Sequence, residues 1–163
     1  GMKRTLALTV CLILPAGLWA QSSPPALNAT TAQAIVEGCA AHATGKKQSH
    51  AIAVVDAGGH LVSLLRMDGN GYGIMDFAVQ KAGAAAAWGF PTAAMADGAK
   101  STPGFAHAPH VVTVAGGVPV YDSAGRTRIG AVGVSGEAPA DDEACAVAGV
   151  TAAGLRTART ASN

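Results

Sequence analysis

Two cations and one carboxylate lie close together near the middle of the chain. Arg66 and Asp68 fall at the end of a strand-like run and in the glycine-rich stretch after it, and Lys81 falls in the helix-like run that follows. An Arg and a Lys can together hold a carboxylate, and a glycine loop at a strand end lets a ligand approach the backbone. We therefore expect Arg66, Asp68 and Lys81 to line a pocket for an anionic ligand. The alternative is an Arg66–Asp68 pair that only ties the loop to the sheet.

Other kinds of chemistry have weaker support in the sequence. His107 and His110 form a His-x-x-His pair, but no cluster of acids or cysteines nearby completes the four ligands of a structural zinc site, which we do not expect. No nucleophile–base pair is recognisable. An enzyme acting on a small organic acid remains the alternative to a binding protein, with Lys81 or a histidine as general acid or base and Arg66 orienting the carboxylate. We leave open whether the protein is an enzyme.

Apolar periodicity and glycine-rich turns predict the elements that position these residues. Three helices are expected, at residues 30–44, 74–88 and from Pro139 onward, with a further short helix near residues 92–97 in an otherwise irregular stretch. Strands are expected at residues 51–56, 60–66, 111–115, 118–122 and 128–135. Because a hairpin, a helix and a three-stranded meander follow in that order, we predict an α/β (α+β) fold with a five-stranded antiparallel sheet flanked by helices.

The beginning of the chain has the pattern of a secretory signal peptide. Basic residues precede an apolar run, and a break and a small residue at Ala20 follow it, so we expect cleavage before Gln21 and a periplasmic or secreted protein. Gly1, before the initiator Met2, is interpreted as an artificial addition. A linker over residues 21–27 and one domain over residues 28–160 complete the expected organisation.

Export has consequences for the cysteines and the charge. Cys39 and Cys145 remain after cleavage, and an even pair in an oxidising compartment favours a disulfide, with two buried thiols as the alternative. The mature chain keeps nine basic against ten acidic residues and has no clustered basic surface. We therefore expect a small-molecule ligand, no nucleic-acid partner and a mature form that is not embedded in a membrane.

Three segments, in this order and spacing, resemble the GlcG/HbpS-like family, which includes the C-terminal domain of PduO-type proteins. The first runs from Ala53-Val54-Val55-Asp56-Ala57-Gly58-Gly59-His60-Leu61-Val62 to Arg66-Met67-Asp68-Gly69. The second is the helix that contains Lys81-Ala82. The third holds Gly116-Gly117-Val118-Pro119-Val120, Ile129-Gly130-Ala131-Val132-Gly133-Val134-Ser135-Gly136 and Asp141-Asp142-Glu143. The likeness spans about residues 28–157.

The resemblance implies a profilin-like fold, homo-oligomers (a dimer or an octamer), and haem as a ligand, since some members bind it. Haem then needs an iron ligand from the protein. We expect His107 or His110 in this role, because both lie in the irregular stretch, and His42 is a further candidate because some relatives use an N-terminal histidine. Covalent attachment is excluded, since the chain has no Cys-x-x-Cys-His motif.

Overall fold

A computed structural model describes residues 26–161 of the chain. The predicted signal peptide and nearly all of the predicted linker lie outside these residues. The chain is α+β, and its elements run in the following order. They are α1 (Ala29–Gly45), β1 (Ala51–Asp56), β2 (Leu61–Arg66), α2 (Tyr72–Trp88), α3 (Thr92–Ser101), the short 3₁₀ helix η1 (Phe105–His107), β3 (Gly117–Tyr121), β4 (Arg128–Ser135) and α4 (Pro139–Ala152).

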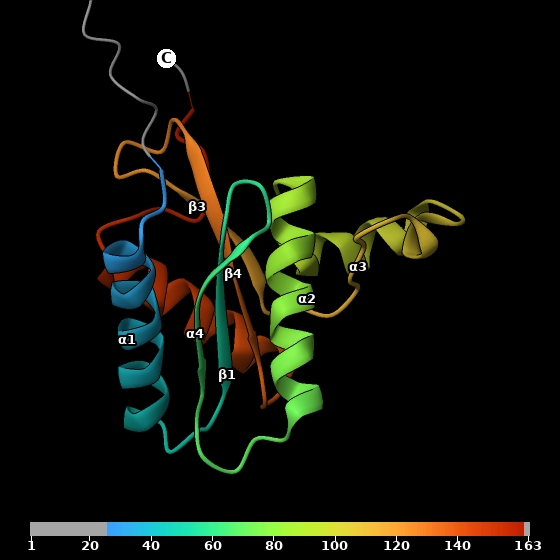
Figure 1. The fold of residues 1–163 in the computed structure, drawn as a ribbon. Coiled ribbons are helices and arrows are strands. Elements are labelled where there is room, and N and C mark those ends of the chain that lie inside the picture. Colours follow the sequence, from blue (N-terminus) through green and yellow to red (C-terminus); the bar gives the residue numbers. More distant parts are fainter. Residues whose placement is uncertain (1–25, 162–163) are drawn as a thin grey trace, which may run out of the picture.

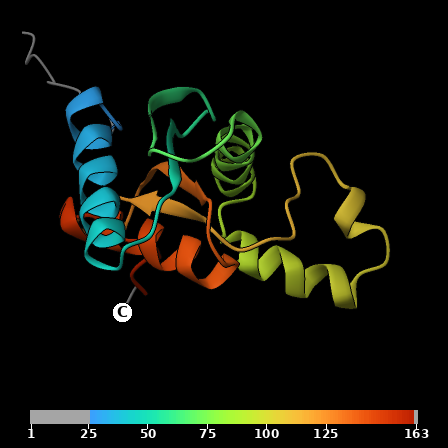
Figure 2. The same ribbon diagram turned by 90° about the horizontal axis from the view of Figure 1, so that it is seen from below.

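The four strands form one antiparallel sheet in the order β2-β1-β4-β3. Helices α1 and α4 cover one face of the sheet, and α2 covers the other (Figures 1 and 2). Side chains alternate across strand β1, so Ile52 and Val54 enter the core beneath α1 and α4, while Ala51, Ala53 and Val55 face α2. The sheet is therefore buried on both faces along its centre.

The layer between α2 and the sheet is built from small side chains. Ala78, Ala82 and Ala85 pack against β1 and β4, and a Cβ at Gly133 would collide with the backbone of α2. Glycine at this position lets the helix backbone lie directly on the strand. Most of the alanines of α2 are therefore buried within the chain.

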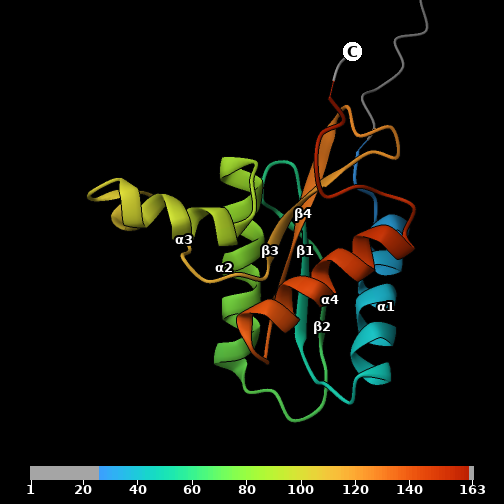
Figure 3. The ribbon, with the colours of Figure 1, turned by 180° about the vertical axis from the view of Figure 1, so that it is seen from behind.

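Helices α1 and α4 pack against each other on the same face of the sheet, and Figure 3 shows α4 in front of the strands with α1 beside it. A disulfide joins the two helices. Cys39 of α1 and Cys145 of α4 have Cα atoms 4.8 Å apart and bonded sulfur atoms. Both cysteines are fully buried. The predicted bridge is confirmed.

The prediction of five strands is wrong. Residues 111–115 are rich in β-branched side chains, yet they form no strand, and β3 begins only at Gly117. Val111 and Val112 lie along α2 instead, and the backbone N–H of Gly117 donates to the Thr92 hydroxyl at the start of α3 (2.9 Å). Contacts with α2 and α3 therefore hold this part of the chain, in place of pairing with the sheet.

Two further boundaries differ from those predicted. The stretch after α2 is more helical than expected, because α3 extends to Ser101 and η1 follows it. Together they form an arm that projects from the body of the domain (Figure 1). Leu27, which we assigned to the linker, is 7% exposed and belongs to the core beneath α1. Asn28 caps α1, accepting the backbone N–H of Thr31 (2.8 Å).

Candidate functional site

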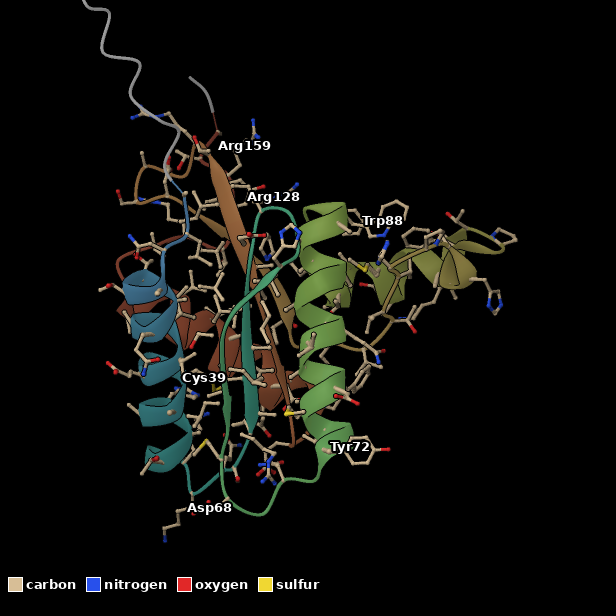
Figure 4. All side chains as sticks on the ribbon, viewed as in Figure 1. Cys39, Asp68, Tyr72, Trp88, Arg128 and Arg159 are labelled. Carbon is tan, nitrogen blue, oxygen red and sulfur yellow. A yellow bond between two sulfur atoms is a disulfide. The ribbon has the colours of Figure 1, made fainter. Side chains whose placement is uncertain are left out.

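Arg66 and Asp68 lie at one end of the sheet, Arg66 as the last residue of β2 and Asp68 in the loop between β2 and α2. The Asp68 side chain is exposed at the end of the molecule (Figure 4), and its carbonyl oxygen accepts the Ser49 hydroxyl (2.6 Å). The exposed Arg66 donates to the carbonyl oxygen of Asn70, in the same loop. No ion pair joins Arg66 and Asp68 among residues 26–161. Arg66 thus ties the loop to the strand through the backbone carbonyl of Asn70, and not through the carboxylate of Asp68.

Lys81 lies elsewhere. Its side chain is only 1% exposed, and its ammonium donates to the carboxylate of Asp142 (2.9 Å) and to the carbonyl oxygen of Val134 (2.8 Å). The ammonium also lies 4.8 Å from the centroid of the Phe77 ring. The expected convergence of Arg66, Asp68 and Lys81 on one cavity is therefore not found in the described part of the chain. Lys81 is paired inside the fold.

Asp142 is the centre of a buried polar network. Besides Lys81, its carboxylate contacts Nδ1 of His50 (3.0 Å) and accepts the backbone N–H of Glu137 (3.0 Å). Since a carboxylate only accepts hydrogen bonds, Nδ1 of His50 is the donor in this contact. Nε2 of His50 is buried and has no hydrogen-bond partner among the described residues. The Asp142 carboxylate is therefore shared by the Lys81 ammonium and the His50 ring.

The network joins parts of the chain that lie on both sides of the sheet. His50 precedes β1, Lys81 comes from α2 and Asp142 from the first turn of α4. Asp141 and Asp142 occupy that first turn, where negative charge suits the helix dipole. The buried Lys81–Asp142 pair thereby links α2 to α4. A closed network leaves Lys81 without access to a substrate in this conformation.

The three candidate histidines have different surroundings. His42 is half-buried on α1, with its Nε2 enclosed and without a partner. His107 is exposed in η1, on the projecting arm. His110 is exposed too, but it follows the arm and lies against the body of the domain, where it lines two adjacent hollows. Of the three, His110 is the one that lines these two hollows.

The two hollows lie between the β1–β2 turn, the outer side of α2 and residues 110–112. Their volumes are about 200 Å³ and 430 Å³, and they share Gly59, Gly83 and His110. Small-molecule sites usually occupy roughly 300–1,000 Å³. The remaining lining is mostly small or apolar: Ala57, Gly58, Val79, Gln80, Ala84, Ala86, Ala87, Val111 and Val112. We call this combined space the α2 hollow.

The walls of the α2 hollow are held by specific contacts. The Asp56 carboxylate accepts the backbone N–H groups of Gly58 and His60 (both 2.9 Å), which fixes the β1–β2 turn. The bond from the His60 N–H is the largest cause that lowers the pKa of Asp56 below its ordinary value. The ionised Asp56 carboxylate therefore holds the turn that forms one wall of the hollow.

The wall on the arm side is anchored by aromatic residues. Trp88, at the end of α2 (Figure 4), packs edge-on against Phe90 and Phe105, with ring centroids 6.2 and 5.2 Å apart. Its indole N–H donates to the carbonyl oxygen of Pro109 (3.0 Å). The next residue, His110, has a φ of 60°, a left-handed conformation uncommon outside glycine. Such conformations persist where the surroundings impose them, often at functional sites.

The sequence profile of a family described as "Haem degrading protein HbpS-like" matches residues 27–151. The chain belongs to the HbpS-like family. A comparison with curated protein sequences found no match. The resemblance inferred from the three sequence segments is thereby confirmed.

Solved structures share the fold. The crystal structure of HbpS aligns with a TM-score of 0.72 and 26% identity, covering 81% of this chain and 93% of HbpS. A double mutant of HbpS from Streptomyces reticuli aligns with a TM-score of 0.71 and 27% identity, covering 89% and 97%. A structure titled as a PduOC:heme complex has a TM-score of 0.74 at 21% identity and covers 83% of this chain and all of its own.

Two residues of the buried network were missed at the sequence level. His50 was not singled out, and Asp142 was interpreted only as a helix-capping acid. One signal was available for Lys81: it stands three residues after Ala78 and four before Ala85, so it lies within the apolar stripe of its helix. A lysine in such a stripe needs a buried counter-charge.

No group of three or more His, Cys, Asp or Glu side chains in residues 26–161 is arranged to hold a metal ion. In the same residues, no helix has the length and apolar character needed to cross a membrane.

Proposed function

We propose that this protein binds haem in the α2 hollow, with His110 as the ligand to iron. The family description names haem, and the lining of the hollow is mostly small or apolar, as a flat apolar macrocycle needs. The observation that carries the proposal is that His110 lines this hollow together with Gly83, Ala84 and Ala87 of α2. Haem supplies the iron chemistry, and the protein supplies the ligand and the surface.

Small residues on α2 support a planar ligand. A Cβ at Gly83 meets no atom within 4 Å, so the space above this residue is open. The alanine side chains beside it are apolar and short, so a flat ring can lie against the helix within van der Waals distance. Gln80, at the edge of the hollow, offers an amide for polar groups at the rim of the macrocycle.

Imidazole is a common axial ligand to haem iron. The His110 side chain is exposed, and its backbone is held between Pro109, which accepts the Trp88 indole N–H, and the valines that pack along α2. Arg66 and Asp68 remain a predicted contact for an anionic group at the far end of the molecule. The burial of Lys81 speaks against the alternative enzyme that uses this lysine as acid or base.

We further propose that the protein is exported to the periplasm or secreted, and that it forms homo-oligomers. The disulfide supports export, because such bonds persist in oxidising compartments. The exposed hydrophobic side chains Leu61 and Leu64 on the edge strand β2, and Tyr72 on α2, support association, since they offer apolar surface to a second copy.

A haemin titration of the purified protein tests the ligand and the site together. We expect saturable binding, and a shift of the Soret band typical of histidine ligation. The Gly83→Leu variant should lose most of this binding, because leucine fills the hollow, and it should fold normally, because leucine suits a helix better than glycine. Gly73→Leu is the matched control, since Gly73 is also in α2, has open space around it and lies outside the hollow.

The histidine is tested by His110→Ala, with His107→Ala as the control three residues away. We expect His110→Ala alone to change the Soret band and to weaken haemin binding by at least tenfold. Absence of haemin binding by the unaltered protein would overturn the function. Binding that survives both Gly83→Leu and His110→Ala would place the ligand elsewhere and refute the proposed site.

A further inference from the structure

The chain continues past α4 and folds back onto the opposite end of the sheet. Residues 154–161 cross the turn between β3 and β4, where Arg156 pairs with Tyr121 and the backbone N–H of Thr160 donates to the carbonyl oxygen of Gly125 (2.9 Å). The Thr160 hydroxyl donates to the carbonyl oxygen of Ala124 (3.0 Å). Backbone and side-chain bonds therefore fix this C-terminal segment in place.

Two adjoining hollows open between the C-terminal segment and the β3–β4 turn. Their volumes are about 430 Å³ and 530 Å³, and Arg159 and Thr160 line both. Arg126 lines the first and Arg156 the second. Figure 4 shows Arg159 at the end of the molecule opposite to Asp68. We call this space the arginine hollow.

Positive charge is concentrated around the arginine hollow. Three of the five arginines in residues 26–161 line it, at positions 126, 156 and 159. None of them forms an ion pair with an acidic side chain in the described part of the chain. Asp122, at the base of the turn, directs its carboxylate to the backbone N–H groups of Arg126 (2.8 Å) and Thr127 (3.2 Å) instead.

One of these guanidinium groups is already oriented. Nε of Arg156 donates to the carbonyl oxygen of Ser123 (3.0 Å), which fixes the plane of the group beside the hollow. The remaining N–H groups of Arg156 have no hydrogen-bond partner in residues 26–161. An arginine fork held by one bond to the backbone can present its other two nitrogens to two oxygens of a single anion.

One wall of the arginine hollow lies outside the part of the chain that the family profile matches. The match ends at residue 151, so it includes Arg126, whereas Arg156, Arg159 and Thr160 follow it. The α2 hollow, built from residues 57 to 112, shares none of these residues. A ligand in the arginine hollow would therefore contact residues other than those of the α2 hollow.

We propose that the arginine hollow is a second binding site, which takes a small molecule through a multiply charged oxyanion group, either a phosphate or a pair of carboxylates. Arg126, Arg156 and Arg159 approach the hollow from two different segments, so the anion bridges the β3–β4 turn and the C-terminal segment. Both kinds of group offer the paired oxygens that a guanidinium fork matches.

The test is a titration followed by nuclear magnetic resonance of the ¹⁵N-labelled protein, with inorganic phosphate in one arm and citrate in the other, at constant ionic strength. We expect saturable shifts confined to residues 121–127 and 154–161 in at least one arm. The arm with the tighter binding identifies the oxyanion. Replacing Arg126 and Arg159 by glutamine should weaken that binding by at least about tenfold, as expected for the loss of hydrogen bonds to a charged group.

The control removes the same amount of charge elsewhere. Lys46 and Lys47 are exposed just beyond α1, and the Lys46→Gln, Lys47→Gln variant should bind the anion within about twofold of the unaltered protein. Titrations that do not saturate below about 10 mM in either arm would overturn the proposal. An equal loss of affinity in the lysine variant would also overturn it, since binding would then follow net charge rather than the hollow.

Discussion

Two lysine–aspartate pairs in the described residues have the same nitrogen–oxygen distance, but one pair is buried and the other is exposed. Comparing them measures how much the buried position of Lys81 contributes to stability. In both pairs the ammonium nitrogen lies 2.9 Å from a carboxylate oxygen. The Lys81–Asp142 side chains are 1% and 3% exposed, whereas the Lys100–Asp97 side chains are both 77% exposed. The substitutions Lys81→Met and Lys100→Met therefore remove the same contact from two different environments.

We expect Lys81→Met to cost about 3–5 kcal/mol in free energy of unfolding. The substitution leaves the Asp142 carboxylate buried, with only the His50 ring and the Glu137 N–H to stabilise its charge, and removes a donor from the Val134 carbonyl. Breaking one side of a buried pair typically has this cost. For a domain of this size the midpoint of thermal unfolding should fall by roughly 10–20 °C. Lys100→Met should change the free energy of unfolding little, because solvent screens an exposed pair.

Chemical and thermal unfolding followed by circular dichroism measures both variants. The double variant Lys81→Met, Asp142→Asn should be less destabilised than Lys81→Met alone, because the asparagine carries no charge that needs a partner and still accepts from Glu137. A cost of Lys81→Met as small as that of Lys100→Met would refute the reasoning. It would mean that Lys81 is not held in the buried network in solution.

Four further predictions follow from other parts of the molecule. Reduction of the disulfide should lower the free energy of unfolding by about 2–5 kcal/mol, because the bridge closes a long loop; thermal unfolding with and without dithiothreitol measures this. The hydrogen bond from the backbone N–H of Arg126 is the largest cause that lowers the pKa of Asp122. The contribution of Asp122 to the stability of the fold is therefore complete above about pH 4 and is lost as the pH falls through its pKa in the folded protein. Asp122→Asn should therefore lose less stability than the unaltered protein as the pH falls below about 4 in acid unfolding. Light scattering at micromolar concentration should show an oligomer, and a purely monomeric mass would contradict that expectation. Mass spectrometry of the exported protein should find Gln21 at its N-terminus, and retention of residues 2–20 would contradict cleavage.

The elements of the fold were largely predictable, because their signals are local. Strand β4 has the predicted bounds, and α1 is capped at Asn28 as its sequence suggests. The run at residues 111–115 misled the prediction because its valines fit a strand by type. Its position depends on α2 and on the Thr92 contact with Gly117, and neither is visible in the run itself.

The site was less predictable, because its contacts are far apart in sequence. Lys81 and Asp142 are separated by 61 residues, and His50 lies 92 residues before Asp142. A lone lysine in a helix has the same local sequence whether it faces a ligand or a buried acid. His110 was one of three candidates, and the feature that separates it from His107 and His42 is the hollow beside it, which only the packed arm creates.

The disulfide between α1 and α4 turns most of the domain into a closed ring. Everything from Cys39 to Cys145, including the whole sheet, α2 and the arm, lies inside that ring. A mechanical pull on the two chain ends is then carried by the bridge and by the parts of α1 and α4 outside the ring. The α2 hollow bears none of that load, whereas the arginine hollow, whose C-terminal wall lies beyond Cys145, would open first. The two proposed sites thus differ in their resistance to force.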